Sequence, residues 1–391
     1  MTDTGSTSVL HLTTSFPKTY QDSSGIFILR LIEHLMQLGI PCWVLAPGSK
    51  SEETFGNVLR FNYAPSRFQF LSGRPGGIPA ALRKNPYLFI LVPSLIFCMG
   101  LALVRFAKNF NLIHAHWSIC GLVAIITKPL HHKPVITTLR GSDVSWAEKI
   151  LFYRMFHSYT LRHSDFVVGV NGVIVDRLKL KYSTRSERFV FIPNGVDHAF
   201  FEAYREHTIS TSPIKLLFVG SLIKRKGLDV LINALTRVRG EYRLTIVGDG
   251  PEKESLNRLV IDNGLESNVV FVGTRPPWSI PSIMASHDLL ILPSYSEGRP
   301  NVILEAMAAG LPVLATDIDG TRELVCHKEN GWLFPPGDSK TLAKELTAII
   351  RQRHLIPDMG KRASNWIRSN GLTWENTASS YAKLYKRALA L

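Results

Sequence analysis

Short apolar runs rich in β-branched residues alternate with longer helical patterns along most of this 391-residue chain. A parallel strand needs a connection of a dozen or more residues, usually a helix, before the next strand of the same sheet. The alternation therefore predicts a parallel sheet covered by helices on both faces. The strands expected in the first half of the chain are residues 9–15, 42–46, 112–116, 135–139, 166–170 and 189–192.

The same alternation restarts after a polar, irregular segment at residues 205–213. Its first helix, expected at 227–238, places Leu228, Leu231 and Leu235 on one face, as packing against a sheet requires. We predict an α/β protein of two Rossmann-like doubly wound domains, residues 1–205 and 206–373, with a final helix at 374–391 that returns to the first domain. The strands of the second domain are expected at residues 215–219, 243–247, 269–272, 289–292 and 312–315.

The formal net charge of +14 is concentrated in the first half of the chain. Residues 1–200 hold 21 Lys/Arg against 11 Asp/Glu, and no acidic residue lies between Glu53 and Asp143. Clustered cations attract an anionic membrane leaflet, an anionic lipid-linked acceptor or nucleic acid, and charge alone does not choose among them. A basic surface without a partner is the alternative. The ten basic residues of this stretch are Arg60, Arg67, Arg74, Arg83, Lys84, Arg105, Lys108, Lys128, Lys133 and Arg140.

Residues 87–104 form an uncharged apolar run near the lower length limit for a membrane span. Pro93 interrupts the run, and basic residues flank it on both sides. A spanning helix would separate strands that are expected to share one sheet, so this interpretation is the least favoured. An ordinary buried helix and an interfacial helix that enters the headgroup region are equal alternatives.

The four cysteines show neither a paired spacing nor a His/Cys cluster with metal-ligand spacing. They predict reduced thiols in a cytoplasmic protein. The first residues, MTDTGSTSVLHL, lack a basic region followed by an apolar run, so no secretory signal is expected. We therefore expect a cytoplasmic protein. Its basic first half also suits peripheral contact with the cytoplasmic face of a membrane.

The strongest chemical signal is EGRPNVILE, which places Glu297 and Glu305 eight positions apart across an expected loop-to-helix junction. A helix that begins there points the amides of Asn301 and Val302 toward a ligand, where they suit a phosphate. Glu297 precedes this helix and Glu305 lies more than one turn inside it, so the two carboxylates can accept hydrogen bonds from the hydroxyl groups of a sugar and of a ribose. The alternative is a pair of solvated acids near a helix end.

Cations also follow the strand expected at 215–219, in the run GSLIKRKG at 220–227. The carboxyl ends of strands are where open α/β sheets bind ligands. Lys226 is therefore expected to neutralise a diphosphate leaving group. A basic surface turn is the alternative.

Two histidines, His114 and His116, lie at the carboxyl end of an expected strand and point to the same face because side chains alternate along a strand. They predict contact with a substrate, and the alternative is a pair of hydrogen-bonded core histidines. No third metal ligand is spaced nearby in the sequence, so a metal site is not favoured. Asp317 and Asp319 resemble the carboxylate pair that binds a divalent ion in another class of sugar transferases, but Lys226 and a helix end already supply such charge.

Together these segments resemble glycosyltransferase family 4, the large family of retaining transferases with the GT-B fold, in which two Rossmann-like domains face a cleft. The resemblance spans most of the chain and rests on six motifs in the family's order. They are HAHW at 114–117, RGSD at 140–143, PNGVD at 193–197, VGSLIKRKG at 219–227, VGDGP at 247–251 and EGRPNVILE at 297–305.

The resemblance implies that His116 and Glu297 face the donor sugar and that Lys226 meets the donor diphosphate. It also implies that Glu305 holds the ribose and that Gly25 leaves room near the phosphates. Retention of the anomeric configuration, no cofactor and no required metal follow from it. The remaining implied positions are Ser221, Arg225, Asn301 and Val302 around the donor, and Arg140 and Asp143 on the acceptor side.

Two positions depart from the family's usual pattern. Many members carry Arg where this chain has Ser221, so we expect Arg225 to compensate in binding the diphosphate. Many also carry a Gly-Gly loop where this chain has Ser24-Gly25, which leaves the donor loop more crowded.

The expected function is transfer of a sugar from a nucleotide-diphosphate-sugar to a glycan or lipid-linked acceptor, in assembly of a cell-surface polysaccharide. The alternative is a nucleotide-sugar epimerase, because some such enzymes resemble this two-domain architecture. Binding of nucleic acid is not expected, because it leaves Glu297 and Glu305 without a role.

Overall fold

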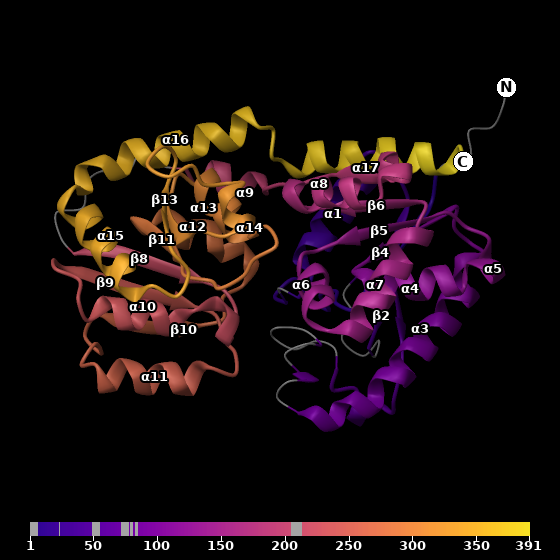
Figure 1. The fold of residues 1–391 in the computed structure, drawn as a ribbon, viewed down its shortest axis with the longest axis horizontal. Helices are drawn as coiled ribbons and strands as arrows, with labels where there is room; N and C mark the ends of the chain where they lie inside the picture. The colour runs from indigo at the N-terminus through magenta and orange to yellow at the C-terminus, as the bar shows by residue number, and fades with distance from the viewer. Residues whose placement is uncertain are drawn as a thin grey trace. The chain divides into compact units, whose positions relative to one another are not determined.

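The computed structural model describes residues 7–22, 24–48, 55–71, 78, 81–82, 85–204 and 213–391. The chain divides into two compact units (Figure 1), which are described one at a time. Unit 1 comprises Met1–Asn194 and Trp374–Leu391, and unit 2 comprises Gly195–Thr373. The sequence places the boundary instead at 205/206, inside an irregular segment whose residues 205–212 lie outside the described residues. Arg74, Arg83 and Lys84 of the basic stretch also lie outside them.

Unit 1 is built on a parallel sheet of seven strands in the order β3-β2-β1-β4-β5-β6-β7. The strands are short and mainly apolar, as expected for a sheet that helices cover on both faces. In register, His11 of β1 pairs with His114 of β4. The strand bounds are β1 Val9–Leu12, β2 Cys42–Pro47, β3 Val58–Phe61, β4 Leu112–His116, β5 Val135–Leu139, β6 Phe166–Gly169 and β7 Phe189–Phe191.

Helices cover both faces of this sheet because side chains alternate along each strand. Val9 of β1 packs in the cluster that contains α1 and α17. Leu10, the next residue, packs in the cluster that contains α3 and α4 on the other face. The helices are α1 Ile26–Gln37, α3 Leu91–Ala107, α4 Ser118–Ile126, α5 Lys128–His131, α6 Ser142–Lys149, α7 Leu151–His163, α8 Gly172–Lys181 and α17 Trp374–Leu389.

The last helix, α17, completes unit 1 although it follows the whole of unit 2 in the sequence. It lies beside α1 (Figure 1), and Trp374, Tyr381 and Tyr385 are buried against the sheet. Tyr385 also forms a hydrogen bond with His114 of β4. The C-terminal segment therefore belongs to the core that holds the histidines in place.

Unit 2 contains a parallel sheet of six strands in the order β10-β9-β8-β11-β12-β13. Its large core includes Leu216, Leu217 and Phe218 of β8, all fully buried. The strand bounds are β8 Ile214–Val219, β9 Tyr242–Val247, β10 Val269–Gly273, β11 Leu289–Leu292, β12 Val313–Thr316 and β13 Trp332–Phe334.

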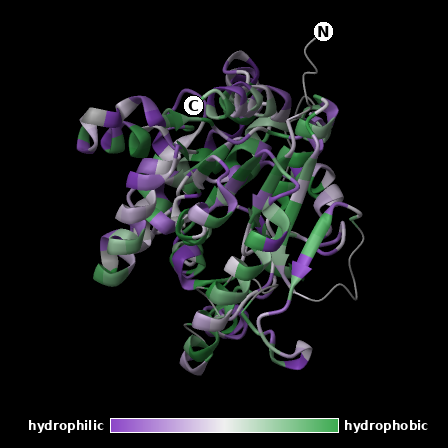
Figure 2. Ribbon diagram, turned by 90° about the vertical axis from the view of Figure 1, so that its right-hand side faces the viewer, coloured by the Kyte–Doolittle hydropathy of each residue, from purple (hydrophilic) through white to green (hydrophobic). Residues whose placement is uncertain are grey.

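The longer helices α15 and α16 of unit 2 bury one apolar stripe and expose the opposite side, whereas α10 and α13 are mostly buried. In α10 the buried stripe includes Leu228, Leu231 and Leu235, as the spacing predicts, but the helix is shorter than expected and runs from Leu228 to Leu235. The others are α9 His198–Glu202, α11 Lys253–Asp262, α12 Ile280–Ala285, α13 Asn301–Ala308, α14 Asp319–Arg322, α15 Ser339–Arg351 and α16 Ile356–Ser369. Figure 2, coloured by hydropathy, shows mainly hydrophobic strands and helices of mixed hydropathy.

All eleven strands expected from the sequence are present at shifted bounds, so the prediction of two doubly wound parallel sheets is confirmed. Two edge strands, β3 and β13, are absent from the prediction. Length alone does not explain the omission, because β1 and β7 are equally short and are predicted. Arg60 interrupts the apolar run of β3, and no pattern in the sequence singles out β13.

Candidate functional site

The strand order of each sheet reverses at one place, between β1 and β4 in unit 1 and between β8 and β11 in unit 2. The crevice outside the carboxyl ends of the strands at such a switch point is where open α/β sheets bind ligands. His11 and His116 lie at the first switch point, while Lys226 and Glu297 follow the strands of the second. Each unit therefore carries its candidate residues where its topology predicts a ligand site.

In unit 2, the Lys226 ammonium donates a hydrogen bond of 2.6 Å to Oε1 of Glu297. The Glu297 side chain is only 7% exposed and that of Lys226 13% exposed. Charges this deeply buried require partners, and each of the two supplies one for the other. The structure thus brings together the two residues on which the expected chemistry depends.

Gly227 allows the turn that carries Lys226 to lie against the end of β11. Its φ of +63° lies in the left-handed region, and a Cβ there would lie 2.1 Å from the carbonyl oxygen of Pro293. The amide of Tyr295 donates to the carbonyl of Arg225 at 2.9 Å, which fixes the same contact. Glycine at position 227 is therefore a requirement of the site and not only a helix start.

Further donors surround the Glu297 carboxylate. Arg225 Nη1 lies 3.2 Å from Oε2 and donates to the Ser296 carbonyl at 2.6 Å, while the Ser294 hydroxyl donates to Oε1 at 2.8 Å. Burial raises the pKa of Glu297, but Lys226, Arg225 and the hydrogen bonds outweigh it, so the pKa lies below its ordinary value. The carboxylate is ionised at neutral pH, and the cluster of two cations and one anion is net positive.

The remaining donor-side candidates of unit 2 lie just after β8 and in α13, the helix that follows β11. Asn301 and Val302 begin α13, as the sequence predicts for a helix N-terminus, and Glu305 lies a turn further along the helix, half-buried. Ser221 is half-buried just after β8. Gly320, a position not predicted from the sequence, lies against the backbone of Glu297, and a Cβ there would be 2.5 Å from the Glu297 carbonyl oxygen.

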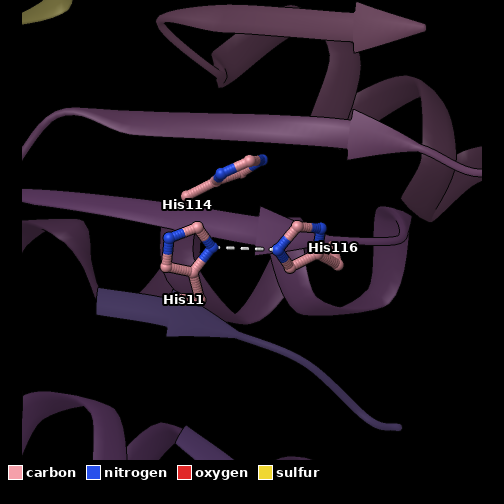
Figure 3. Close-up of side chains that lie close together, drawn as sticks. All are labelled: His11, His114 and His116. Atoms are coloured by element: carbon pink, nitrogen blue, oxygen red, sulfur yellow. Dashed lines mark hydrogen bonds between the residues drawn. The ribbon is translucent and has the colours of Figure 1, made fainter. Parts of the chain in front are cut away.

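In unit 1, His116 is buried and belongs to a chain of hydrogen bonds, of which Figure 3 shows the bond to His11. Arg140 Nη2 lies 2.9 Å from His116 Nδ1, and His116 Nε2 lies 3.1 Å from His11 Nδ1. A guanidinium only donates, so His116 Nδ1 accepts and the Nε2–H of the neutral ring donates to His11. The arrangement fixes both the tautomer and the ring orientation of His116.

All three histidines of this cluster are neutral. Burial and, to a smaller extent, the Arg140 charge together lower the pKa of His11 to about 3. Burial, followed by the neighbouring histidines and Arg140, holds the pKa values of His114 and His116 well below the ordinary value. The imidazoles can therefore accept and donate hydrogen bonds at neutral pH without carrying charge.

His11, His114 and His116 also offer nitrogen atoms within 4.8 Å of one another, which is the geometry of a candidate metal site. His114, however, uses Nδ1 for Tyr385 Oη at 2.8 Å and Nε2 for Thr138 Oγ1 at 2.7 Å. A cation would displace such bonds and would lie near the guanidinium of Arg140. We interpret the cluster as a hydrogen-bonded chain and not as a metal centre.

The two acceptor-side candidates have different environments. Arg140 donates to Asn194 Oδ1 at 2.8 Å and lies 4.6 Å from the centroid of the Phe27 ring, so its guanidinium is held firmly. Asp143 is buried and accepts from the amides of Ser118 and Arg140 at 3.2 and 3.1 Å. Asp143 thus orders the loop that carries Arg140.

Gly25 precedes α1 and has a φ of +73°. A Cβ at this position would lie 2.4 Å from the Ser15 carbonyl oxygen, in the loop that follows β1. The position therefore requires glycine for packing of the loop itself, whatever ligand lies beyond it.

His11 is a site residue that was not predicted from the sequence. It lies 105 positions before His116 and joins it only because β1 and β4 are neighbours in the sheet. A signal was present, because His11 interrupts the apolar run VLHL of a buried strand. A polar residue at such a position needs a partner.

Two family models together match most of the chain. Residues 24–200 match the family model described as Glycosyltransferase Family 4, and residues 200–366 match the model described as Glycosyl transferases group 1. The chain is 26% identical over 358 residues to a putative colanic acid biosynthesis glycosyltransferase, WcaL, from Escherichia coli, covering 84% of this chain and 87% of that protein.

Two solved structures share the fold over nearly the full chain. Sucrose-phosphate synthase from Thermosynechococcus elongatus superposes with a TM-score of 0.79 at 20% identity, covering 98% of this chain and 99% of the other. Anabaena HepE in complex with UDP and glucose superposes with a TM-score of 0.75 at 22% identity, covering 97% and 100%. At such identities the superpositions establish the fold.

Proposed function

Because the chain belongs to glycosyltransferase family 4 and has the GT-B fold, we propose that this transferase uses a nucleotide-diphosphate-sugar and retains the anomeric configuration. The observation that carries the proposal is the Lys226–Glu297 pair, buried at the switch point of unit 2. A charged lysine held beside a helix N-terminus suits a leaving diphosphate. The structure of HepE with UDP and glucose supports the choice of a nucleotide-sugar donor.

The proposed chemistry assigns each polar group one task. Lys226, Arg225 and the first turn of α13 stabilise the negative charge that develops on the diphosphate as the glycosyl bond breaks. Glu297 accepts hydrogen bonds from hydroxyls of the donor sugar, and Glu305 accepts them from the ribose. The neutral His116 faces the donor sugar, and it can bind a sugar hydroxyl by exchanging the hydrogen bond that it forms with Arg140 or with His11. The cations supply the charge that a divalent metal supplies in other transferases, so no metal is required.

The acceptor hydroxyl attacks from the side of the leaving group, and its proton passes to a phosphate oxygen of the departing diphosphate. The new glycosidic bond forms as the bond to the diphosphate breaks, which leaves a nucleoside diphosphate and a glycosylated acceptor with the configuration of the donor. This route needs no dedicated nucleophile from the protein.

We assign the acceptor to a glycan or a lipid-linked saccharide in assembly of a cell-surface polysaccharide. The similarity to WcaL, a protein of colanic acid biosynthesis by its name, supports this assignment. The basic first half of the chain also suits an acceptor that carries phosphate. A cytoplasmic location stays a prediction.

The test is a two-step assay on the purified chain. A panel of nucleotide-sugars is first screened by thermal shift, because a ligand that binds the native state raises the midpoint. The preferred donor is then incubated with and without an acceptor glycan, and the products are examined by proton NMR. The proposal predicts an acceptor-dependent product with the donor's anomeric configuration. Conversion of the donor without an acceptor, or an inverted product, would contradict it.

A further inference from the structure

The segment Pro86–Ala107 exposes large apolar side chains although its other side packs in the core. Leu95, Met99 and Leu103 of α3 are buried against the sheet of unit 1. On the opposite side, Tyr87 is 90% exposed, Ile90 82% and Phe97 67%, and Leu101 is exposed as well. An apolar surface of this kind on a folded domain marks an interaction site.

The helix α7 repeats the pattern, although its sequence does not stand out as apolar. Phe152 is 67% exposed and Met155 64%, one turn apart on the outer side of α7. His157 and Leu161 lie on the buried side of the same helix. A surface helix of a soluble domain ordinarily places polar residues at such outer positions. In α7, as in α3, large apolar side chains occupy some of them.

The two helices flank α4 on the same face of the sheet. Gly100 of α3 approaches α4 closely, since a Cβ there would lie 3.5 Å from Thr127 just after that helix. Gly121 of α4 approaches α7 even more closely, since a Cβ there would lie 2.6 Å from Thr160. α4 is almost wholly buried between them, so α3 and α7 form the outer layer of this face.

Both helices also run in the same direction, because α3 leads into β4 and α7 leads into β6 of a parallel sheet. Their N-terminal ends therefore lie toward the carboxyl ends of the strands. Tyr87 and Ile90 near the start of α3, and Phe152 at the start of α7, belong to this end. One part of the exposed apolar surface thus lies toward the end of the sheet where His116 and Arg140 lie, and Phe97 and Leu101 extend it along α3.

Cations follow the apolar residues on each helix. The exposed Arg105 and Lys108 lie at the end of α3, and the exposed Arg162 lies in the last turn of α7. No acidic residue occurs between Glu53 and Asp143, so nothing in this stretch of the sequence offsets the charge of α3. Apolar side chains beside Lys and Arg suit the interface of an anionic bilayer, where acyl chains and headgroups lie side by side.

The packing of α3 shows whether this helix can cross a bilayer or can only lie on its surface. By length and composition Pro86–Ala107 is long and apolar enough to cross a membrane. Leu95, Met99 and Leu103, however, pack in one cluster with Leu10 of β1 and Ile113 of β4. A spanning helix would remove these contacts from the core of the sheet.

We propose that unit 1 docks on an anionic bilayer through an apolar face formed by Tyr87, Ile90, Phe97 and Leu101 of the α3 segment together with Phe152 and Met155 of α7. The face lies in the interface plane and does not span the bilayer. It brings the carboxyl end of the unit 1 sheet to the headgroup level, where a lipid-linked acceptor presents its saccharide. Only this last step, the delivery of the acceptor, rests on the proposed function.

The test is flotation of the full chain with vesicles of pure phosphatidylcholine or of phosphatidylcholine mixed with phosphatidylglycerol. Wild type is expected to float with the mixed vesicles, and less at high salt. The double variants Phe97→Ser/Leu101→Ser and Phe152→Ser/Met155→Ser are each expected to bind about tenfold more weakly or worse, since each removes two inserted side chains. The double variant Ile261→Ser/Val270→Ser, at exposed apolar positions of unit 2, is the matched control and should bind as wild type.

Three outcomes would overturn the proposal. They are no flotation of wild type, equal losses in the control and in the two test variants, and a wild-type dimer by light scattering that the test variants dissociate. The last outcome would assign the face to a second copy of the chain. Transfer to a soluble acceptor is measured in parallel, because the proposed function predicts that it persists in both test variants. If wild type shows no transfer to the soluble acceptor, the proposed function is refuted, and the flotation result stands independently of it.

Discussion

Lys226 and Glu297 meet at 2.6 Å although 71 positions separate them in the sequence. Adjacent strands β8 and β11 bring their loops together at the switch point of the sheet. The carboxylate neutralises the ammonium in this structure, and a bound diphosphate can replace it as the lysine's partner. The ion pair therefore keeps a cation positioned for the developing charge of a leaving group.

The first prediction concerns Gly227, whose replacement by Ala must strain the turn that carries Lys226. A Cβ would meet the Pro293 carbonyl at 2.1 Å, and a φ of +63° adds the left-handed penalty of about 1–2 kcal/mol. Gly264→Ala is the matched control, because Gly264 has a φ of +64° but no atom lies within 4 Å of the place that its Cβ would take. Urea unfolding should show a clearly larger loss for Gly227→Ala, and equal losses would contradict the close approach.

The second prediction concerns the departure from the family's pattern at Ser221. If Arg225 replaces the arginine that many members carry at position 221, then Arg225→Ala should weaken donor binding about tenfold, the effect of one charged hydrogen bond. Adding Ser221→Arg to this variant should restore most of the affinity. Calorimetric titration of the three proteins with the preferred nucleotide-sugar measures both effects. An unchanged affinity of Arg225→Ala would remove Arg225 from the diphosphate site.

The third prediction separates the two carboxylates of the EGRPNVILE motif. Glu305→Ala should raise KM for the donor with a smaller effect on kcat, because the ribose does not change during transfer. Wild type should also prefer the ribonucleotide donor over its 2′-deoxy analogue, and the variant should lose much of that preference. Steady-state kinetics with the two donors tests this. A retained preference would place the ribose elsewhere.

The fourth prediction follows from the neutral histidines of unit 1. In the unfolded chain each takes up a proton as the pH falls through about 6.5, whereas the folded pKa of His11 is about 3. The unfolded state then binds more protons, so the free energy of unfolding falls below pH 6.5 by about 1.4 kcal/mol per pH unit for each such group. His11→Gln should therefore reduce the slope of stability against pH between pH 6.5 and 4.

The control for this experiment is His163→Gln on the surface of α7, where the ring is exposed. This variant should leave the slope near the wild-type value. Urea midpoints measured at several pH values give both slopes. Equal slopes for His11→Gln and wild type would contradict the buried, neutral state of the cluster.

The sequence contained most of the fold but only the local parts of the site. Strands such as Leu112–His116 and Ile214–Val219 are apolar runs between helical patterns, and the motifs that follow them place Lys226 and Glu297 at strand ends. Periodicity does not show which strands are neighbours, however. The hydrogen bond between His11 and His116 depends on β1 lying beside β4, a contact between segments about a hundred residues apart in the chain.

Only the α3 part of the apolar face of unit 1 could be predicted from the sequence, for a related reason. The run at 87–104 is uncharged and stands out in the sequence, whereas α7 mixes Phe152 and Met155 with Arg154 and His157. Only the burial of its other side shows which of these residues face outward. Whether a helical stripe is core or surface is decided by its partners, which a single sequence does not display.

The most direct test of the central claim is the turnover of Lys226→Ala beside Lys224→Ala, an exposed lysine in the same turn. Release of nucleoside diphosphate with the preferred donor and acceptor is the measurement, and thermal unfolding checks that both variants fold. The account predicts that Lys226→Ala loses about 100-fold or more in kcat, as for removal of a group that stabilises the transition state, while Lys224→Ala retains wild-type turnover. Near-normal turnover of a folded Lys226→Ala variant would contradict the account.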